Sequence, residues 1–128
     1  MRHRHTDTGR SGELAAVGHL IRRGYRIVER NYRTREGEID IVAVHGSTLV
    51  FCEVKTLAKR DGAARGPASP LEGVRPAKRV QVRKIARAWL ADRRGRAAGY
   101  QDLRFDAIGV LVSVRGDVLR IDHIEAGF

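Results

Sequence analysis

The spacing of apolar residues alternates along the chain between the period of a helix and that of a strand, and these changes predict the elements. A first amphipathic helix is expected over residues 9–24, where Gly24 suits the position that follows a helix. A second is expected over residues 76–92, where Pro76 suits the first turn. The predicted apolar stripes are Leu14, Val17, Leu20 and Ile21 in the first helix and Val82, Ile85 and Trp89 in the second, with Lys78 extending the latter.

Segments rich in β-branched and alternating apolar residues predict five strands. Two of them form a hairpin over residues 37–55, one strand precedes it over 25–32, and two follow the second helix over 103–112 and 118–125. The strands on either side of the second helix are expected to be parallel neighbours, and each helix has one apolar face with which to cover a sheet. The predicted fold class is therefore α/β, with a mixed central sheet flanked by helices.

A hairpin turn centred between Gly46 and Ser47 fixes the register of the two central strands. Asp40 is then expected directly opposite Glu53, and Glu38 opposite Lys55. The alternate residues of each strand point to the other side of the sheet, where only apolar side chains meet. These apolar residues are Ile39, Ile41 and Ala43 on one strand and Val50, Cys52 and Val54 on the other.

The expected opposition of Asp40 and Glu53 points to chemistry, because two carboxylates at cross-strand distance repel unless a proton or a cation lies between them. A hard divalent cation such as Mg²⁺ prefers oxygen ligands of this kind. Lys55 projects from the same face. A metal, two acids and an adjacent amine suit the hydrolysis of a phosphodiester. The alternative is a ladder of cross-strand ion pairs on a solvated face.

Other polar residues are expected near these acids. Arg33 and Arg35 lie in the segment that enters the hairpin, and Lys78 points from the second helix toward the same region, with Gln81 close to that line. They can contact phosphates or simply be solvated. Glu13 lies in the first turn of the first helix, where a helix-terminus charge is the simpler interpretation.

Composition restricts the setting in which this chemistry operates. The 128 residues are expected to form a single domain, with a flexible basic tail over residues 1–8 and a long flexible loop over 56–76 beside the site. The net charge of +10 favours a nucleic-acid partner, although a solvated basic surface explains it too. The sequence has no long apolar run and no secretory signal, and Cys52 is its one cysteine. These features predict a cytoplasmic protein that does not contact membranes.

Asp40 followed by Glu53-Val54-Lys55 resembles the PD-(D/E)xK signature of restriction-endonuclease-like nucleases, with Ile39 where the usual proline stands. The common core of that fold is αβββαβ. Over residues 9–125 the chain resembles more closely the uncharacterised YraN-type family of bacterial proteins, which is similar to archaeal Holliday-junction resolvases. The blocks that carry this likeness are Gly12-Glu13 with Ala16, Gly24-Tyr25, Arg30-Asn31-Tyr32-Arg33, residues 37–42, residues 51–55, Lys78 and Arg104-Phe105-Asp106.

The resemblance implies a Mg²⁺- or Mn²⁺-dependent endonuclease that acts on structured or branched DNA and leaves a 5′-phosphate. It implies that Asp40 and Glu53 bind the metal, that Glu13 and the Val54 carbonyl are further ligands, and that Lys55 orients the attacking water. The residues then expected to contact nucleic acid are Lys78, Gln81, Arg33 and Arg35. A resolvase-like enzyme needs two sites, which implies a homodimer. The alternatives are a catalytically inactive nucleic-acid-binding module on the same fold and a partner-binding adaptor.

Overall fold

The computed structural model describes residues 7–58, 76–92 and 99–127. The predicted order of helices and strands is confirmed. Among the described residues, neither helix has the length and apolarity that crossing a bilayer requires. The elements are α1 (Asp7–Arg22), β1 (Arg26–Thr34), β2 (Gly37–His45), β3 (Thr48–Ala58), α2 (Pro76–Asp92), β4 (Asp102–Val112) and β5 (Val118–Ile124).

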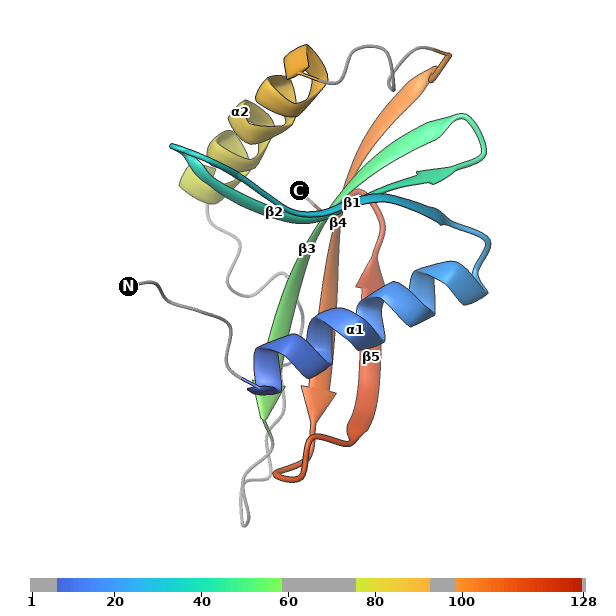
Figure 1. Cartoon of the computed structure of the whole chain (residues 1–128), viewed down its shortest axis with the longest axis vertical. Helices are drawn as coiled ribbons and strands as arrows, with labels where there is room; N and C mark the ends of the chain where they lie inside the picture. Colours follow the sequence, from blue (N-terminus) through green and yellow to red (C-terminus); the bar gives the residue numbers. More distant parts are fainter. Residues whose placement is uncertain (1–6, 59–75, 93–98, 128) are drawn as a thin grey trace.

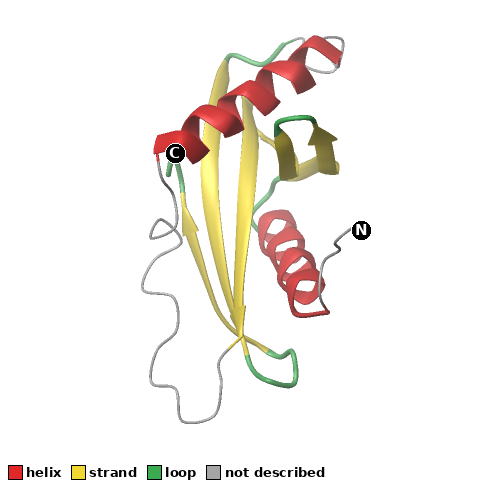
Figure 2. Cartoon of the chain, turned by 90° about the vertical axis from the view of Figure 1, so that its left-hand side faces the viewer, coloured by secondary structure: helices red, strands yellow, loops and turns green. Residues whose placement is uncertain are grey.

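The strands form one sheet in the order β1-β2-β3-β4-β5. β3 and β4 run parallel, as predicted for the strands that α2 separates, and all other neighbours run antiparallel. The two helices lie on different sides of this sheet (Figures 1 and 2). The predicted class, α/β with a mixed sheet flanked by helices, is confirmed and is compatible with an αβββαβ core.

The differences in element boundaries change the predicted tail and the predicted loop. α1 begins at Asp7, so the expected tail over residues 1–8 is too long, and residues 1–6 lie outside the described residues. β3 continues to Ala58, because Thr56, Leu57 and Ala58 still pair with β4. The expected loop over 56–76 therefore begins later, and residues 59–75 lie outside the described residues.

The predicted stripe of α2 is confirmed. Val82, Ile85 and Trp89 are buried and pack on one side of the sheet, against residues of β2 and β3 such as Val42 and Phe51. Lys78 extends this stripe toward the start of the helix, where its Nζ lies 2.9 Å from Oε2 of Glu53. α2 therefore brings a cation to the part of β3 that carries the candidate chemistry.

The predicted stripe of α1 is partly wrong. Leu14 and Ile21 are each 55% exposed, whereas Ala16 and Leu20 are fully buried on the other side of the sheet. The reason is the close approach of the helix to β3, because a Cβ placed on Gly12 would lie 1.8 Å from Oγ1 of Thr56. Small residues therefore select the face of α1 that meets the sheet, and Glu13 is buried on that face at 6% exposure.

The hairpin register is confirmed near the turn, but the ladder ends earlier than predicted. Pairing runs from His45 and Thr48 to Ile41 and Cys52 and stops there. The expected opposed pairs, Asp40 with Glu53 and Glu38 with Lys55, do not form because β2 leaves β3 at this point while it stays paired with β1. Ile39 also lies on the α2 side of the sheet and not beside Cys52 and Val54, so that part of the prediction is wrong.

Candidate metal centre

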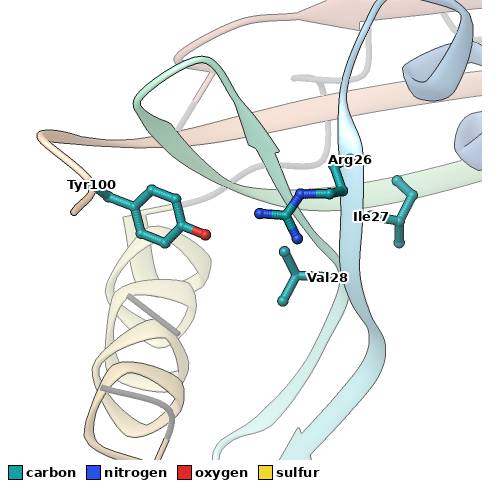
Figure 3. Close-up of a pocket in the computed structure, with 4 residues that line it drawn as sticks. All are labelled: Arg26, Ile27, Val28 and Tyr100. Carbon is teal, nitrogen blue, oxygen red and sulfur yellow. The ribbon is translucent and has the colours of Figure 1, made fainter. Parts of the chain in front are cut away.

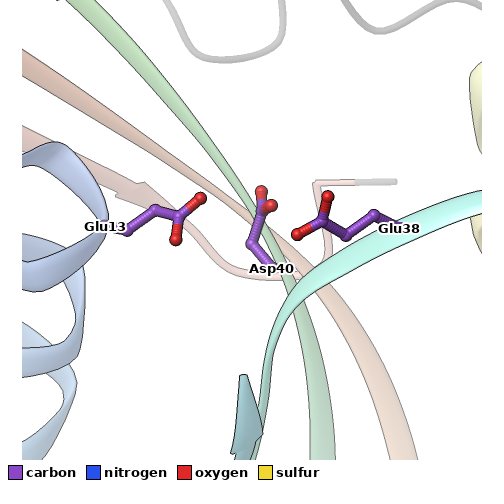
Figure 4. A group of neighbouring side chains, drawn as sticks. All are labelled: Glu13, Glu38 and Asp40. Carbon is purple, nitrogen blue, oxygen red and sulfur yellow. The ribbon is translucent and has the colours of Figure 1, made fainter. Parts of the chain in front are cut away.

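Three carboxylates converge where β2 leaves β3. Glu13 comes from α1 and Glu38 and Asp40 come from β2, and one side-chain oxygen of each lies within 4.8 Å of the others. Figure 4 shows the three side chains pointing toward one another from these two elements. Oxygen atoms at such spacing suit a hard cation, since Mg²⁺ and Mn²⁺ take carboxylate ligands.

Asp40 stands at the centre of the local electrostatics. It is only 8% exposed, and its Oδ2 accepts a hydrogen bond of 2.6 Å from the backbone N–H of Val54. Burial and, next, the negative charge of Glu53 raise the pKa of Asp40 to about 8, although the Val54 hydrogen bond opposes this. Glu13 and Glu38 raise it further. The cluster therefore needs a proton or a cation at neutral pH.

Glu53 lies beside this cluster but outside the three-carboxylate group. Its Oε2 pairs with Lys78, while its Oε1 is buried and has no hydrogen-bond partner among the residues that the structure describes. Burial raises the pKa of Glu53 even though Lys78 opposes the shift. A buried, unpartnered carboxylate oxygen beside three other acids is costly unless a cation satisfies it.

Cations and one amide surround the outer carboxylates. Nη2 of Arg30 lies 3.8 Å from Oε1 of Glu13, and Nε of Arg33 lies 3.7 Å from Oε1 of Glu38. The amide nitrogen of Asn31, when it faces the acids, donates to Glu38 at 2.7 Å and to Glu13 at 3.1 Å. Asn31 has a φ of 55°, in the left-handed region that asparagine tolerates better than most residues. These contacts orient two of the three candidate ligands.

The other predicted site residues are placed as follows. Arg35 and Lys55 are exposed, and Lys55 lies two residues beyond Glu53 on β3. The side-chain amide of Gln81 donates to the carbonyl of Glu36, so this residue fixes the β1–β2 turn against α2. Val54 takes part through its N–H, which Asp40 accepts.

Sequence reasoning missed Glu38 as a member of the cluster and missed the role of Asn31. Glu38 was expected opposite Lys55, and only the divergence of β2 from β3 turns it toward Asp40. Asn31 offered one signal, because asparagine is a residue type suited to the left-handed conformation and it stands within β1. Neither feature follows from strand alternation.

A second buried carboxylate shows how the same fold treats an acid that needs no ligand. Asp106 is fully buried and accepts hydrogen bonds from Arg104, from His123 and from the backbone N–H of Ala126. Although burial opposes ionisation, the bonds from His123 and Arg104 keep the pKa of Asp106 below its ordinary value. Asp106 is stabilised as an anion by its own neighbours, whereas burial raises the pKa values of Asp40 and Glu53 despite the contacts from Val54 and Lys78.

Comparison with known sequences gives one family. The family model described as uncharacterised protein family UPF0102 matches residues 12–110, which include Glu13, Glu38, Asp40 and Glu53. A UPF0102 protein of Clavibacter michiganensis is 47% identical over 111 residues, which cover 84% of this chain and 85% of the relative. UPF0102 proteins of Chlorobium phaeobacteroides and of a Parafrankia species are 40% and 44% identical, and each match covers at least 94% of both chains.

Proposed function

We propose that this chain, which belongs to the uncharacterised protein family UPF0102, is a metal-dependent nuclease that hydrolyses phosphodiester bonds in structured or branched DNA. One observation carries the proposal: carboxylates from α1 and β2 converge beside Glu53, whose Oε1 is buried without a hydrogen-bond partner among the described residues, and burial and neighbouring acids raise the pKa of Asp40 to about 8. The αβββαβ order supports it, as does the likeness of Asp40 and Glu53-Val54-Lys55 to the PD-(D/E)xK signature. We also propose that the chain is a YraN-type protein and is related to Holliday-junction resolvases.

The proposed metal is Mg²⁺, with Mn²⁺ as a substitute. Asp40, Glu13 and Glu38 supply the convergent oxygens, and the unpartnered Oε1 of Glu53 and the Val54 carbonyl are candidates to complete the set. The donor set fits the ion, because it consists of carboxylate and carbonyl oxygens that otherwise repel one another. When bound, the metal would supply a Lewis acid for the phosphodiester and offset the negative charge of its ligands.

The basic residues around the cluster have separate proposed roles. Lys55, exposed and on the strand of Glu53, holds the attacking water and stabilises its hydroxide form. Lys78 neutralises Glu53 in the free protein and contacts the scissile phosphate in the complex. Arg33 and Arg35 hold the DNA backbone beyond the cluster, and Gln81 keeps the β1–β2 turn in place beside it.

A non-catalytic nucleic-acid-binding module is the second candidate. The observation that favours it is the ion pair between Lys78 and Glu53, because it offsets part of the negative charge without a metal. The net charge of +10 suits both candidates. In either case the proposed location is the cytoplasm, where the buried thiol of Cys52 stays reduced. For the nuclease, a homodimer would present two sites to a branched substrate.

The decisive experiment is a cleavage assay on junction, flap and plain duplex DNA with Mg²⁺ or Mn²⁺. The nuclease proposal predicts cleavage by the wild type, no cleavage with EDTA, and loss of cleavage in Asp40→Ala and in Glu53→Ala. Cleavage that survives both substitutions would refute it. Salt-sensitive DNA binding without cleavage, and without dependence on metal, would favour the second candidate.

A further inference from the structure

A cavity of about 320 Å³ lies at the opposite end of β1 from the carboxylate cluster. Its lining residues are Arg26, Ile27 and Val28 from β1 and Tyr100 from the segment before β4. Figure 3 shows the guanidinium of Arg26 and the hydroxyl end of Tyr100 facing one another, with Val28 beside them and Ile27 on the other side of the strand. The cavity thus combines an aromatic ring, an aliphatic side chain and a cation.

The aromatic wall is held in place by the backbone that follows it. The N–H groups of Gln101 and Asp102 both donate to the carbonyl of Ser47, in the turn between β2 and β3, at 2.9 and 3.4 Å. Tyr100 itself packs against the core on the α2 side of the sheet and is only partly buried. A partly buried aromatic ring that is anchored at its base is suited to contact with a planar ligand.

The cationic wall differs from the other arginines of β1. Arg30 and Arg33 lie within 4 Å of Glu13 and Glu38, whereas Arg26 has no carboxylate in ion-pair range within residues 7–58, 76–92 and 99–127. Its side chain is exposed. An exposed, uncompensated guanidinium beside an aromatic ring favours an anionic or hydrogen-bond-accepting ligand.

The strand register connects this cavity to the carboxylate cluster. β1 is an edge strand, with Arg26 opposite Val44, Arg30 opposite Ile41 and Arg33 opposite Glu38. Val44 lies four residues from Asp40 on β2, which is about 13 Å along an extended strand. Arg26 shares the α2 side of the sheet with Val44, whereas Arg30 shares the α1 side with Ile41, so a strand that passes between the two places crosses the β1 edge of the sheet.

We propose that this cavity takes an unpaired nucleobase of the substrate strand, stacked on Tyr100, with its phosphate on Arg26. The inference rests on the nuclease proposal, because it identifies the substrate as DNA that has an unpaired segment near the metal centre. The cavity is at the small end of the range for ligand pockets, which suits one base. Stacking on an aromatic ring is tolerant of base identity, so the pocket selects unpaired structure and not sequence.

The test compares two DNA hairpins in metal-free buffer with EDTA, each closed by an ethylene-glycol linker in place of a nucleotide loop, one with a short single-stranded arm and one blunt. Fluorescence anisotropy gives the affinity of each. Tyr100→Leu should weaken binding of the armed hairpin by about 5- to 100-fold and leave the blunt hairpin unchanged, while Tyr100→Phe should bind as the wild type does. Arg26→Gln should weaken the armed hairpin selectively and reduce the salt dependence of its binding. Arg115→Gln, an exposed control in the β4–β5 turn, should not change the ratio of the two affinities.

Equal losses for the two hairpins, or no loss in both Tyr100→Leu and Arg26→Gln, overturn the pocket assignment. Cleavage that still depends on Asp40 then leaves the nuclease proposal in place. The reverse result is also distinguishable: if the wild type cleaves nothing but prefers the armed hairpin through Tyr100, the base pocket holds and the catalytic assignment falls. Arg26→Gln alters only an exposed side chain, so the test remains valid if Tyr100→Leu does not fold.

Discussion

Asp40 accepts a 2.6 Å hydrogen bond from the backbone N–H of Val54 where β2 and β3 stop pairing. The carboxylate takes the place of the backbone acceptor that the departing strand no longer offers. This contact fixes one oxygen of Asp40 at the sheet and keeps the group beside Glu53. The separation of the strands makes room for Glu13 and Glu38 to approach, so the end of the ladder creates the acidic cluster.

The metal-free protein should lose stability as pH rises. Asp40 has a pKa of about 8 in the fold against an ordinary 3.8, so the folded state keeps a proton that the unfolded state releases in this window. The free energy of unfolding therefore falls with rising pH, by at most about 1.4 kcal/mol per pH unit for one proton. Urea denaturation in EDTA across the window measures this slope.

The variant Asp40→Asn should flatten that pH dependence, because its amide oxygen can still accept from Val54 but does not titrate. A smaller slope of the same sign should remain, since burial also raises the pKa of Glu53. Saturating Mg²⁺ should stabilise the wild type most at the alkaline end. A wild type whose stability is constant or rises between pH 3.8 and about 8 would contradict the assignment of this pH dependence to Asp40.

Removing single carboxylates should weaken divalent-metal binding. Calorimetry with Mn²⁺ should give an affinity about tenfold or more lower in Glu13→Gln, Glu38→Gln and Asp40→Asn, because ligand charge sets the affinity for hard cations. Glu36→Gln is the matched control, since Glu36 is exposed in the β1–β2 turn and its side chain is not part of the cluster. Equal affinities for Glu36→Gln and Glu38→Gln would show that Glu38 is not a ligand.

Lys78 should affect metal binding and cleavage in opposite directions. Its amine neutralises Glu53 at 2.9 Å, so it competes with a divalent cation for the same carboxylate. Lys78→Met should therefore raise the Mn²⁺ affinity by a few fold, about 1 kcal/mol for one partly exposed ion pair, while it slows cleavage. Arg79→Met, the neighbouring exposed cation on α2, is the control for net charge. A fall in both quantities would contradict this competition.

The order of elements and the central register were predictable from the sequence, because both depend on local periodicity and on one turn. The stripe of α2 was predictable for the same reason, since Val82, Ile85 and Trp89 are large and apolar. The end of the ladder at Ile41 and Cys52 was not predictable, because alternation does not encode where a strand leaves its neighbour. The position of Glu38 depends on that divergence.

Small residues explain the difference at α1, and distance along the sequence explains the missed cavity. Gly12 and Ala16 choose the face of α1 that meets the sheet, yet they contribute almost nothing to an apolar pattern. The cavity at Arg26 and Tyr100 was also missed, because its walls come from segments far apart in the sequence. Motif spacing thus identified candidate residues, whereas only the folded structure identified the residues that surround them.

The approach of α1 to β3 provides the last prediction, made with two glycines of the same helix. A Cβ on Gly12 would lie 1.8 Å from Oγ1 and 2.7 Å from Cβ of Thr56, whereas one on Gly18 would meet only the flexible end of Arg22 at 3.1 Å. Gly12→Ala should therefore destabilise the protein by roughly 1–3 kcal/mol through overpacking. Gly18→Ala should stabilise it by up to about 1 kcal/mol through helix propensity.

The two variants also test whether the position of α1 controls the metal centre. Displacement of the helix in Gly12→Ala moves the adjacent Glu13 away from Asp40, so the Mn²⁺ affinity should fall even under conditions in which the variant remains folded. Gly18→Ala should bind Mn²⁺ as the wild type does, because it leaves the contact between α1 and β3 intact. Thermal denaturation gives the stabilities and calorimetry the affinities. Normal metal binding by a folded but destabilised Gly12→Ala would show that Glu13 does not contribute a ligand. The reason is that the contact between Gly12 and Thr56 sets the distance of α1, and so of Glu13, from the other acids.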